Sequence, residues 1–147
     1  MRSRLLPDLD RRGFVAACAS CAAAALLGGC ASLVTHPVPV SAGRIRLRLS
    51  SYPELGTRDG AIRIQPDGVA DPLYVLATGD GAFTVVSPIC THRGCTVDVQ
   101  GERLVCPCHG STYDRAGTVL KGPAQRALTR HHAALSGDEL TITLATS

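Results

Sequence analysis

Short stretches in which apolar and polar residues alternate dominate this chain from residue 44 onward. The clearest stretch is 44–49, where arginine alternates strictly with isoleucine or leucine. A period of two places successive side chains on opposite faces of a strand, so this stretch predicts a strand with one apolar and one basic face. Further strands are predicted by similar stretches bounded by Gly, Pro or Asp: 61–64, 73–78, 82–86, 96–99, 103–105, 119–120 and 139–144.

The connections between these stretches favour antiparallel neighbours. Gly79-Asp80-Gly81 and Ser136-Gly137-Asp138 are short turn sequences, and a hairpin is predicted around Gln100-Gly101-Glu102. The segment 124–135 fits a helix or a strand by its pattern, and we predict a strand with an irregular start. The fold class is therefore all-β, with enough residues after position 30 for one domain.

The first thirty residues differ from the rest and predict an export signal, 1–30. Arg11-Arg12-Gly13-Phe14 is similar to a twin-arginine signal, and an apolar run of 16 residues follows. Leu27-Gly28-Gly29-Cys30 is similar to a bacterial lipobox, which would leave Cys30 as a lipidated N-terminus. The alternatives are simple cleavage and an uncleaved anchor, although the run is shorter than the roughly 20 residues that span a bilayer.

This signal predicts a protein that a bacterial cell exports, held by a lipid anchor in the periplasm or on the outer face of a membrane. Residues 31–43, with Pro37 and Pro39, are predicted to form a tether. The formal charge of +3 at pH 7 comes largely from the arginines of the signal, and aromatic residues make up only 3% of the chain. We therefore expect no nucleic-acid partner.

Two segments carry the candidate chemistry: 90–95, with the sequence CTHRGC, and 106–111, with the sequence CPCHGS. Each offers a Cys and a His at a short spacing, so together they supply two thiolates and two imidazoles. That ligand set is the one of a Rieske 2Fe–2S centre, and Cys₂His₂ is also a structural zinc set. Zinc fingers usually pair Cys with Cys and His with His, whereas each segment here mixes the two types, which favours the two-iron cluster.

On these two segments the chain resembles the Rieske family, in its disulfide-containing, bc-complex-like type. The resemblance implies an antiparallel β sandwich over 44–147, with a cluster-binding subdomain at about 87–124 and one 2Fe–2S cluster. It implies that Cys90 and Cys106 bind the inner iron, and that His92 and His109 bind the more exposed iron. Neutral imidazoles leave the cluster less negative than four thiolates do, which raises its reduction potential.

The resemblance also implies a disulfide between Cys95 and Cys108, the cysteines of the two segments that are not ligands. Such a bond persists in an oxidising compartment, in agreement with an export signal. Two free thiols are the alternative.

Arg93 departs from the bc-type pattern, which usually has an apolar residue at this position. A cation there favours an acidic partner surface over an apolar quinone pocket.

Three further positions match residues around the family's cluster. Ser111 and Tyr113 match residues that donate hydrogen bonds to a bridging sulfide and to a cysteine ligand, and such bonds raise the potential. Gly122-Pro123 matches the loop that covers the cluster. Without the resemblance, these residues are ordinary turn and strand residues.

The function we expect is single-electron transfer between a donor enzyme or quinol and a cytochrome-type acceptor. The alternative is a Rieske subunit of an oxidoreductase complex, either a quinol–cytochrome c reductase or a molybdenum oxidase such as arsenite oxidase. We expect no catalysis by this chain alone, because one cluster handles one electron at a time and the sequence has no substrate-cavity signature. A terminal oxygenase is disfavoured because no residues remain for its mononuclear iron domain. A zinc-stabilised structural module is the non-redox alternative.

Overall fold

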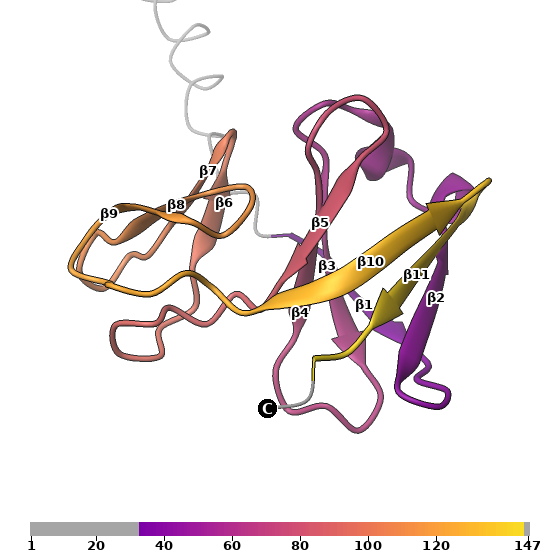
Figure 1. Ribbon diagram of the computed structural model, residues 1–147, viewed down its shortest axis with the longest axis horizontal. Helices are drawn as coiled ribbons and strands as arrows, with labels where there is room; N and C mark the ends of the chain where they lie inside the picture. Colours follow the sequence, from indigo (N-terminus) through magenta and orange to yellow (C-terminus); the bar gives the residue numbers. More distant parts are fainter. Residues whose placement is uncertain (1–32, 146–147) are drawn as a thin grey trace, which may run out of the picture. The chain divides into compact units, whose positions relative to one another are not determined.

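The computed structural model describes residues 33–145, which fold almost entirely into β-strands (Figure 1). The predicted export signal and Cys30 lie outside these residues. Within 33–145, no helix has the length and apolar composition needed to cross a membrane. The elements are β1 Thr35–Val38, β2 Arg44–Arg48, the 3-10 helices η1 Leu49–Ser51 and η2 Pro53–Gly56, β3 Ala61–Pro66, β4 Leu73–Ala77, β5 Phe83–Val86, β6 Asp98–Gln100, β7 Arg103–Val105, β8 Thr112–Asp114, β9 Val119–Lys121, β10 Arg130–Ser136 and β11 Glu139–Thr143.

Seven strands form a sandwich that we call the base. Their order is β1-β3-β4-β5-β10-β11-β2, and β10 connects the two layers. The start of β10, at Arg130 and His131, pairs with β5, whereas the remainder pairs with β11. Figure 1 shows β10 passing from the layer of β3, β4 and β5 to the layer of β11 and β2. The predicted all-β fold is confirmed, and so is a strand with an irregular start in 124–135.

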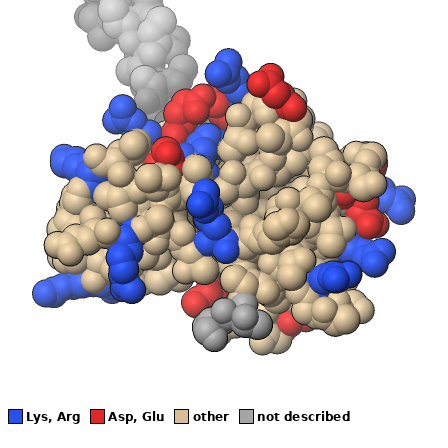
Figure 2. All heavy atoms as spheres, viewed as in Figure 1, with Lys and Arg blue, Asp and Glu red and all other residues tan. Residues whose placement is uncertain are grey.

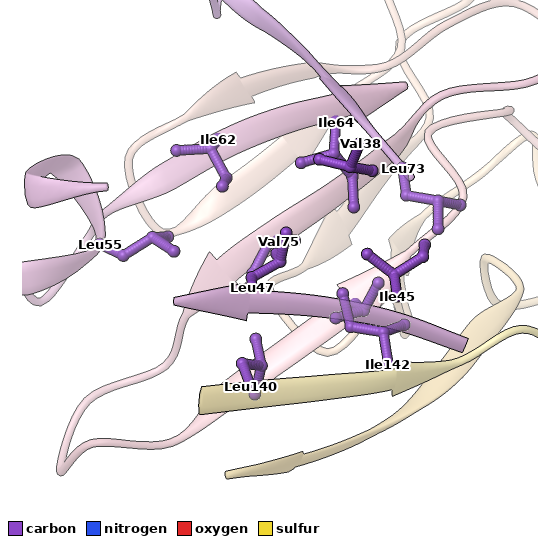
Figure 3. Close-up of a cluster of buried hydrophobic side chains, with 11 residues drawn as sticks. Val38, Ile45, Leu47, Leu55, Ile62, Ile64, Leu73, Val75, Leu140 and Ile142 are labelled. Atoms are coloured by element: carbon purple, nitrogen blue, oxygen red, sulfur yellow. The ribbon is translucent and has the colours of Figure 1, made fainter. Parts of the chain in front are cut away.

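The core of the base consists of aliphatic side chains from both layers (Figure 3). β2 alternates exposed arginines with buried Ile45 and Leu47, as its sequence predicts. Leu140 and Ile142 of β11 are buried on the same side. They face Ile62, Ile64 and Val75 of the opposite layer (Figure 3). Burying each such side chain contributes about 1.5–3 kcal/mol, so this core holds the two layers together.

The predicted tether contains a strand of the base, and the prediction needs correction there. β1 pairs in parallel with β3, from Thr35 opposite Arg63 to Val38 opposite Pro66. Pro37 lies within β1 although proline cannot donate a ladder hydrogen bond. β1 lies at the edge of the sheet, however, where one side of the strand needs no donor. Val38 is buried, so this strand contributes to the core.

A second sheet, of order β6-β7-β8-β9, carries the two cysteine-histidine segments, and we call it with its loops the small subdomain. β4 connects the two parts because it is buried along its whole length. Leu73 and Val75 contribute to the core of the base, whereas Tyr74 and Leu76 contribute to a second core shared with the small subdomain. The Tyr74 hydroxyl also donates to the carbonyl of Val97 at 2.9 Å.

Candidate metal centre

The two cysteine-histidine loops, 90–95 and 106–111, have the same backbone hydrogen bonds. In each loop the amide of the first cysteine donates to the carbonyl of the sixth residue, at 2.8 Å in both. The amide of the fifth residue, a glycine, donates back to the carbonyl of that cysteine, at 2.9 Å in the first loop and 3.0 Å in the second. Gly94 and Gly110 have φ values of 77° and 75°, which residues with a side chain rarely adopt. The sequence therefore builds two matching turns.

These turns bring the four predicted ligands together in two pairs. Cys90 and Cys106 are buried, and they are the free cysteines of the described part of the chain. His92 is half-buried and His109 is exposed. Their ring centroids are 4.8 Å apart and the rings are nearly perpendicular, at 87°. The two thiols are thus more deeply buried than the two imidazoles, as expected for inner and outer ligands.

The Nδ1 atom of His92 tests whether these residues fit a metal cluster. This atom is buried and has no hydrogen-bond partner among the described residues. A buried polar atom without a partner costs about 1–3 kcal/mol, and a ligand nitrogen avoids that cost by binding a metal. Two buried thiols and an unpartnered imidazole nitrogen therefore fit the donor set of a 2Fe–2S cluster.

The remaining two cysteines of the loops form a disulfide, Cys95–Cys108, with a Cα–Cα distance of 6.5 Å. The bridge predicted from the resemblance is confirmed. The Sγ atoms of Cys95, Cys106 and Cys108 lie within 4.8 Å of one another. Disulfide sulfurs are not thiolates, so this sulfur cluster is not a mononuclear metal site. The bridge instead joins the two loops directly.

Tyr113 lies at the centre of a small hydrogen-bond network around Cys90. Its hydroxyl is 3.3 Å from the Cys90 Sγ and accepts the amide of Thr91 at 3.3 Å. The Thr91 hydroxyl donates to the carbonyl of Arg126 at 2.6 Å. Burial alone would raise the pKa of Cys90, but the pKa is lowered because hydrogen bonds from Tyr113, the His92 backbone and Ser111 favour the thiolate. The thiolate is the form that binds iron.

Ser111 connects the second loop to the segment after β9. It is fully buried, and its hydroxyl oxygen accepts the Ala124 amide at 3.0 Å. The hydroxyl hydrogen is therefore free to donate toward the ligand side. Ala124 follows Gly122-Pro123, whose peptide bond is cis. The segment expected to cover the site is thus hydrogen-bonded to the second loop.

Arg115 is a buried residue whose role no motif in the sequence indicates. Its guanidinium donates to three backbone carbonyls: those of Ala77 at 2.8 Å, Gly101 at 2.6 Å and Gly60 at 2.5 Å. Gly60 and Ala77 belong to the base, whereas Gly101 lies in the turn between β6 and β7. Burial lowers the pKa of Arg115, while Asp59 and Glu102 oppose that shift. Arg115 therefore fastens the small subdomain to the base.

The fold and site define a small all-β protein with a paired cysteine-histidine metal centre. The model of the Rieske [2Fe-2S] domain matches residues 56–133, more than half of the chain. The chain belongs to the Rieske family, and its cofactor is one Rieske 2Fe–2S cluster.

Curated relatives include the cytochrome b6-f complex iron-sulfur subunits of two cyanobacteria. The subunit of Cyanothece sp. (strain PCC 7425 / ATCC 29141) is 40% identical, over 50% of this chain and 43% of the relative. The subunit of Nostoc punctiforme (strain ATCC 29133 / PCC 73102) is 30% identical, over 94% of this chain and 86% of the relative. The match to the first of these therefore spans less than half of that protein.

A solved structure shares the fold. It is the complex of reduced oxygenase and oxidized ferredoxin in carbazole 1,9a-dioxygenase, with a TM-score of 0.50 and 23% identity. The similarity covers 61% of this chain and 86% of the matched one. At this identity the likeness supports the fold alone.

Proposed function

We propose that this protein is a single-electron carrier in which Cys90 and Cys106 bind the inner iron and His92 and His109 bind the outer iron. The observation that carries the proposal is the arrangement of the two matching loops. They place two buried thiols behind two neighbouring imidazoles, and the His92 Nδ1 is buried without a partner. When bound, the cluster supplies one-electron redox chemistry.

The residues around the ligands favour the reduced state. Tyr113 and Ser111 are placed to donate hydrogen bonds to sulfur, and such bonds stabilise added negative charge. Arg93 follows His92 directly and is exposed, so it adds a positive charge beside the outer ligands. The second core excludes water from the thiol side, whereas His109 remains accessible to a partner.

We further propose that the protein works outside the cytoplasm, anchored to a membrane through lipidated Cys30. The similarity of residues 11–14 to a twin-arginine signal and of residues 27–30 to a lipobox supports this location. The Cys95–Cys108 disulfide agrees with it, because disulfides persist in oxidising compartments. The electrons would pass from a donor enzyme or quinol to a cytochrome-type acceptor.

A second candidate function is that of a Rieske subunit within an oxidoreductase complex. The relatives named as cytochrome b6-f complex iron-sulfur subunits favour it. Purification of the full chain from its native membrane in mild detergent separates the two candidates. A carrier elutes alone, whereas a subunit elutes with stoichiometric cytochrome or molybdenum protein.

The ligand assignment is tested by metal analysis and electron paramagnetic resonance of the full chain, expressed with its cluster. We expect iron and sulfide in equal amounts and a spectrum of the mixed His/Cys type after reduction. His92→Ala and His109→Ala should each lose the signal. The matched control is His132→Ala, because His132 is exposed on β10 outside both loops. A zinc-loaded, colourless protein would show that the proposed function is wrong.

A further inference from the structure

The loops around the histidine pair carry three exposed basic residues, which we call the collar: Arg93, Lys121 and Arg126. We propose that the collar docks the protein onto an acidic protein surface that surrounds the redox group of its partner. This inference rests on the proposed function, since it names the kind of partner that the carrier meets at its outer ligands.

Contacts within the small subdomain place the three residues around one site. Arg93 follows His92 in the first loop, and the carbonyl of Arg126 accepts the hydroxyl of Thr91, the residue before His92. Lys121 pairs across the sheet with Thr112, directly after the second loop. The three charges thus come from two separate segments, the first loop and 119–128, and the second of these contacts both cysteine-histidine loops. Figure 2 shows blue residues over the part of the molecule that holds β8 and β9.

No carboxylate neutralises these charges within the loops. The segments 88–95, 106–112 and 119–128 contain no Asp or Glu. Among residues 33–145, the salt bridges are Arg46–Glu139 and Arg58–Glu102, so no collar residue is in an ion pair. Asp71 of the base does share a cavity with Thr91. Unpaired charges of one sign on a protruding surface attract an oppositely charged partner and orient its approach.

An exposed apolar residue is the sequence neighbour of a collar residue. Leu120 is 56% exposed and is one of three large hydrophobic residues in 33–145 that the structure leaves on the surface. It directly precedes Lys121, and Pro107 of the second loop and Pro123 after β9 are also exposed. Protein interfaces combine exposed apolar residues with polar and charged ones, and weak redox encounters use small interfaces. A free inorganic anion would gain nothing from exposed apolar residues, so the combination favours a protein.

The test is a binding titration of the full chain with its cluster, at low ionic strength. One probe is cytochrome c, whose surface around the haem is basic, and the other is the same cytochrome with its lysines succinylated, which makes that surface acidic. We expect the succinylated form to bind and the native form to bind more weakly. The triple variant R93Q/K121Q/R126Q should weaken binding of the succinylated form about tenfold and flatten its salt dependence.

The matched control is R44Q/R46Q/R48Q, which removes the same charge from the exposed side of β2 in the base. It should leave binding nearly unchanged. Leu120→Ser should weaken binding without changing the salt dependence, because it removes contact and no charge. Equal weakening by the two triple variants, or tighter binding of native cytochrome c, would overturn the proposal. Binding needs no electron transfer, so a failure here is distinguishable from failure of the carrier function, which the resonance spectrum reports.

Discussion

The base and the small subdomain are stabilised by different kinds of interaction. The base has a core of aliphatic side chains from six strands, packed between two layers. Each of those side chains makes a small, non-directional contribution to stability, so the stability of the base is spread over many residues. The loss of one contact in the base therefore weakens the whole sandwich without releasing any single loop.

The small subdomain relies on a few directional links instead. Its strands have three residues each, and its core includes Cys90, Cys106 and Tyr113 beside the aliphatic side chains. Such a small unit buries too little apolar surface to hold its loops by packing alone. The Cys95–Cys108 disulfide, the Arg115 hydrogen bonds and the Tyr113 network supply the rest. The site is therefore held by separate interactions, and each of them can be removed by substitution without removing the others.

The largest effect should come from Arg115→Met, which breaks the link between the two parts. The carbonyls of Gly60, Ala77 and Gly101 would lose their shared donor. Hydrogen bonds to a charged group contribute about 1.5–3 kcal/mol each, so the loss of all three should lower the free energy of unfolding by at least about 4–5 kcal/mol. Denaturant unfolding should be followed by far-UV circular dichroism for the sheets and by visible absorbance for the cluster.

In this variant, we expect the visible absorbance of the cluster to be lost at a lower denaturant concentration than the circular dichroism of the sheets. Arg103→Met is the matched control, because Arg103 is exposed on β7 of the same subdomain. Arg115→Lys, which keeps a charge but lacks the planar fork, should be intermediate. If Arg115→Met unfolds at the same denaturant concentration as Arg103→Met, Arg115 does not join the two parts.

A cavity in the base should have a somewhat smaller effect, spread over the whole molecule. Ile64 is fully buried in the core of the base. Ile64→Ala should lower the free energy of unfolding by about 3–4 kcal/mol, through lost burial and the cavity that remains. The resonance spectrum of the cluster should not change, because no ligand contacts this core. An altered spectrum would show that the ligands depend on base packing.

Removal of the disulfide should act on the small subdomain alone. Cys95→Ala combined with Cys108→Ala opens a link between residues 13 positions apart. A loop of about this size gives about 2–3 kcal/mol of stabilisation in the chain-entropy model. We expect the cluster to bleach at lower temperature, while the dichroism of the base is retained. Equal shifts of both signals would contradict the separation of the two regions.

The same contrast explains what the sequence could predict. The base strands have a period of two, so 44–49 and 139–144 were predicted within a residue or two at each end. The disulfide came from the resemblance, because the loop cysteines have a recognisable spacing. The four ligand residues remain a prediction that the geometry supports.

Other features have no signature in the residue types. Arg115 donates hydrogen bonds to backbone carbonyls 14 to 55 positions away in the sequence. Every residue has a backbone carbonyl, so the residue types do not reveal these partners. The hydrogen-bond network of Tyr113, Thr91 and Arg126 likewise forms only because the segment after β9 is hydrogen-bonded to the first cysteine-histidine loop. β1 was not predicted because Pro37 and Pro39 indicate a linker, and the edge pairing of β1 with β3 is visible only in the structure. Such features depend on tertiary contacts, so the structure is needed to find them.

The smallest effect concerns a single hydrogen bond and should change the potential more than the stability. Tyr113→Phe removes the donor to the Cys90 sulfur. A bond worth about 1–1.5 kcal/mol in the reduced state corresponds to a reduction potential lower by about 40–60 mV. Voltammetry of the cluster-loaded protein measures the shift, with Tyr52→Phe in the base as the control. An unchanged potential in Tyr113→Phe would mean that the hydroxyl stabilises the Thr91 loop and does not act on the thiolate.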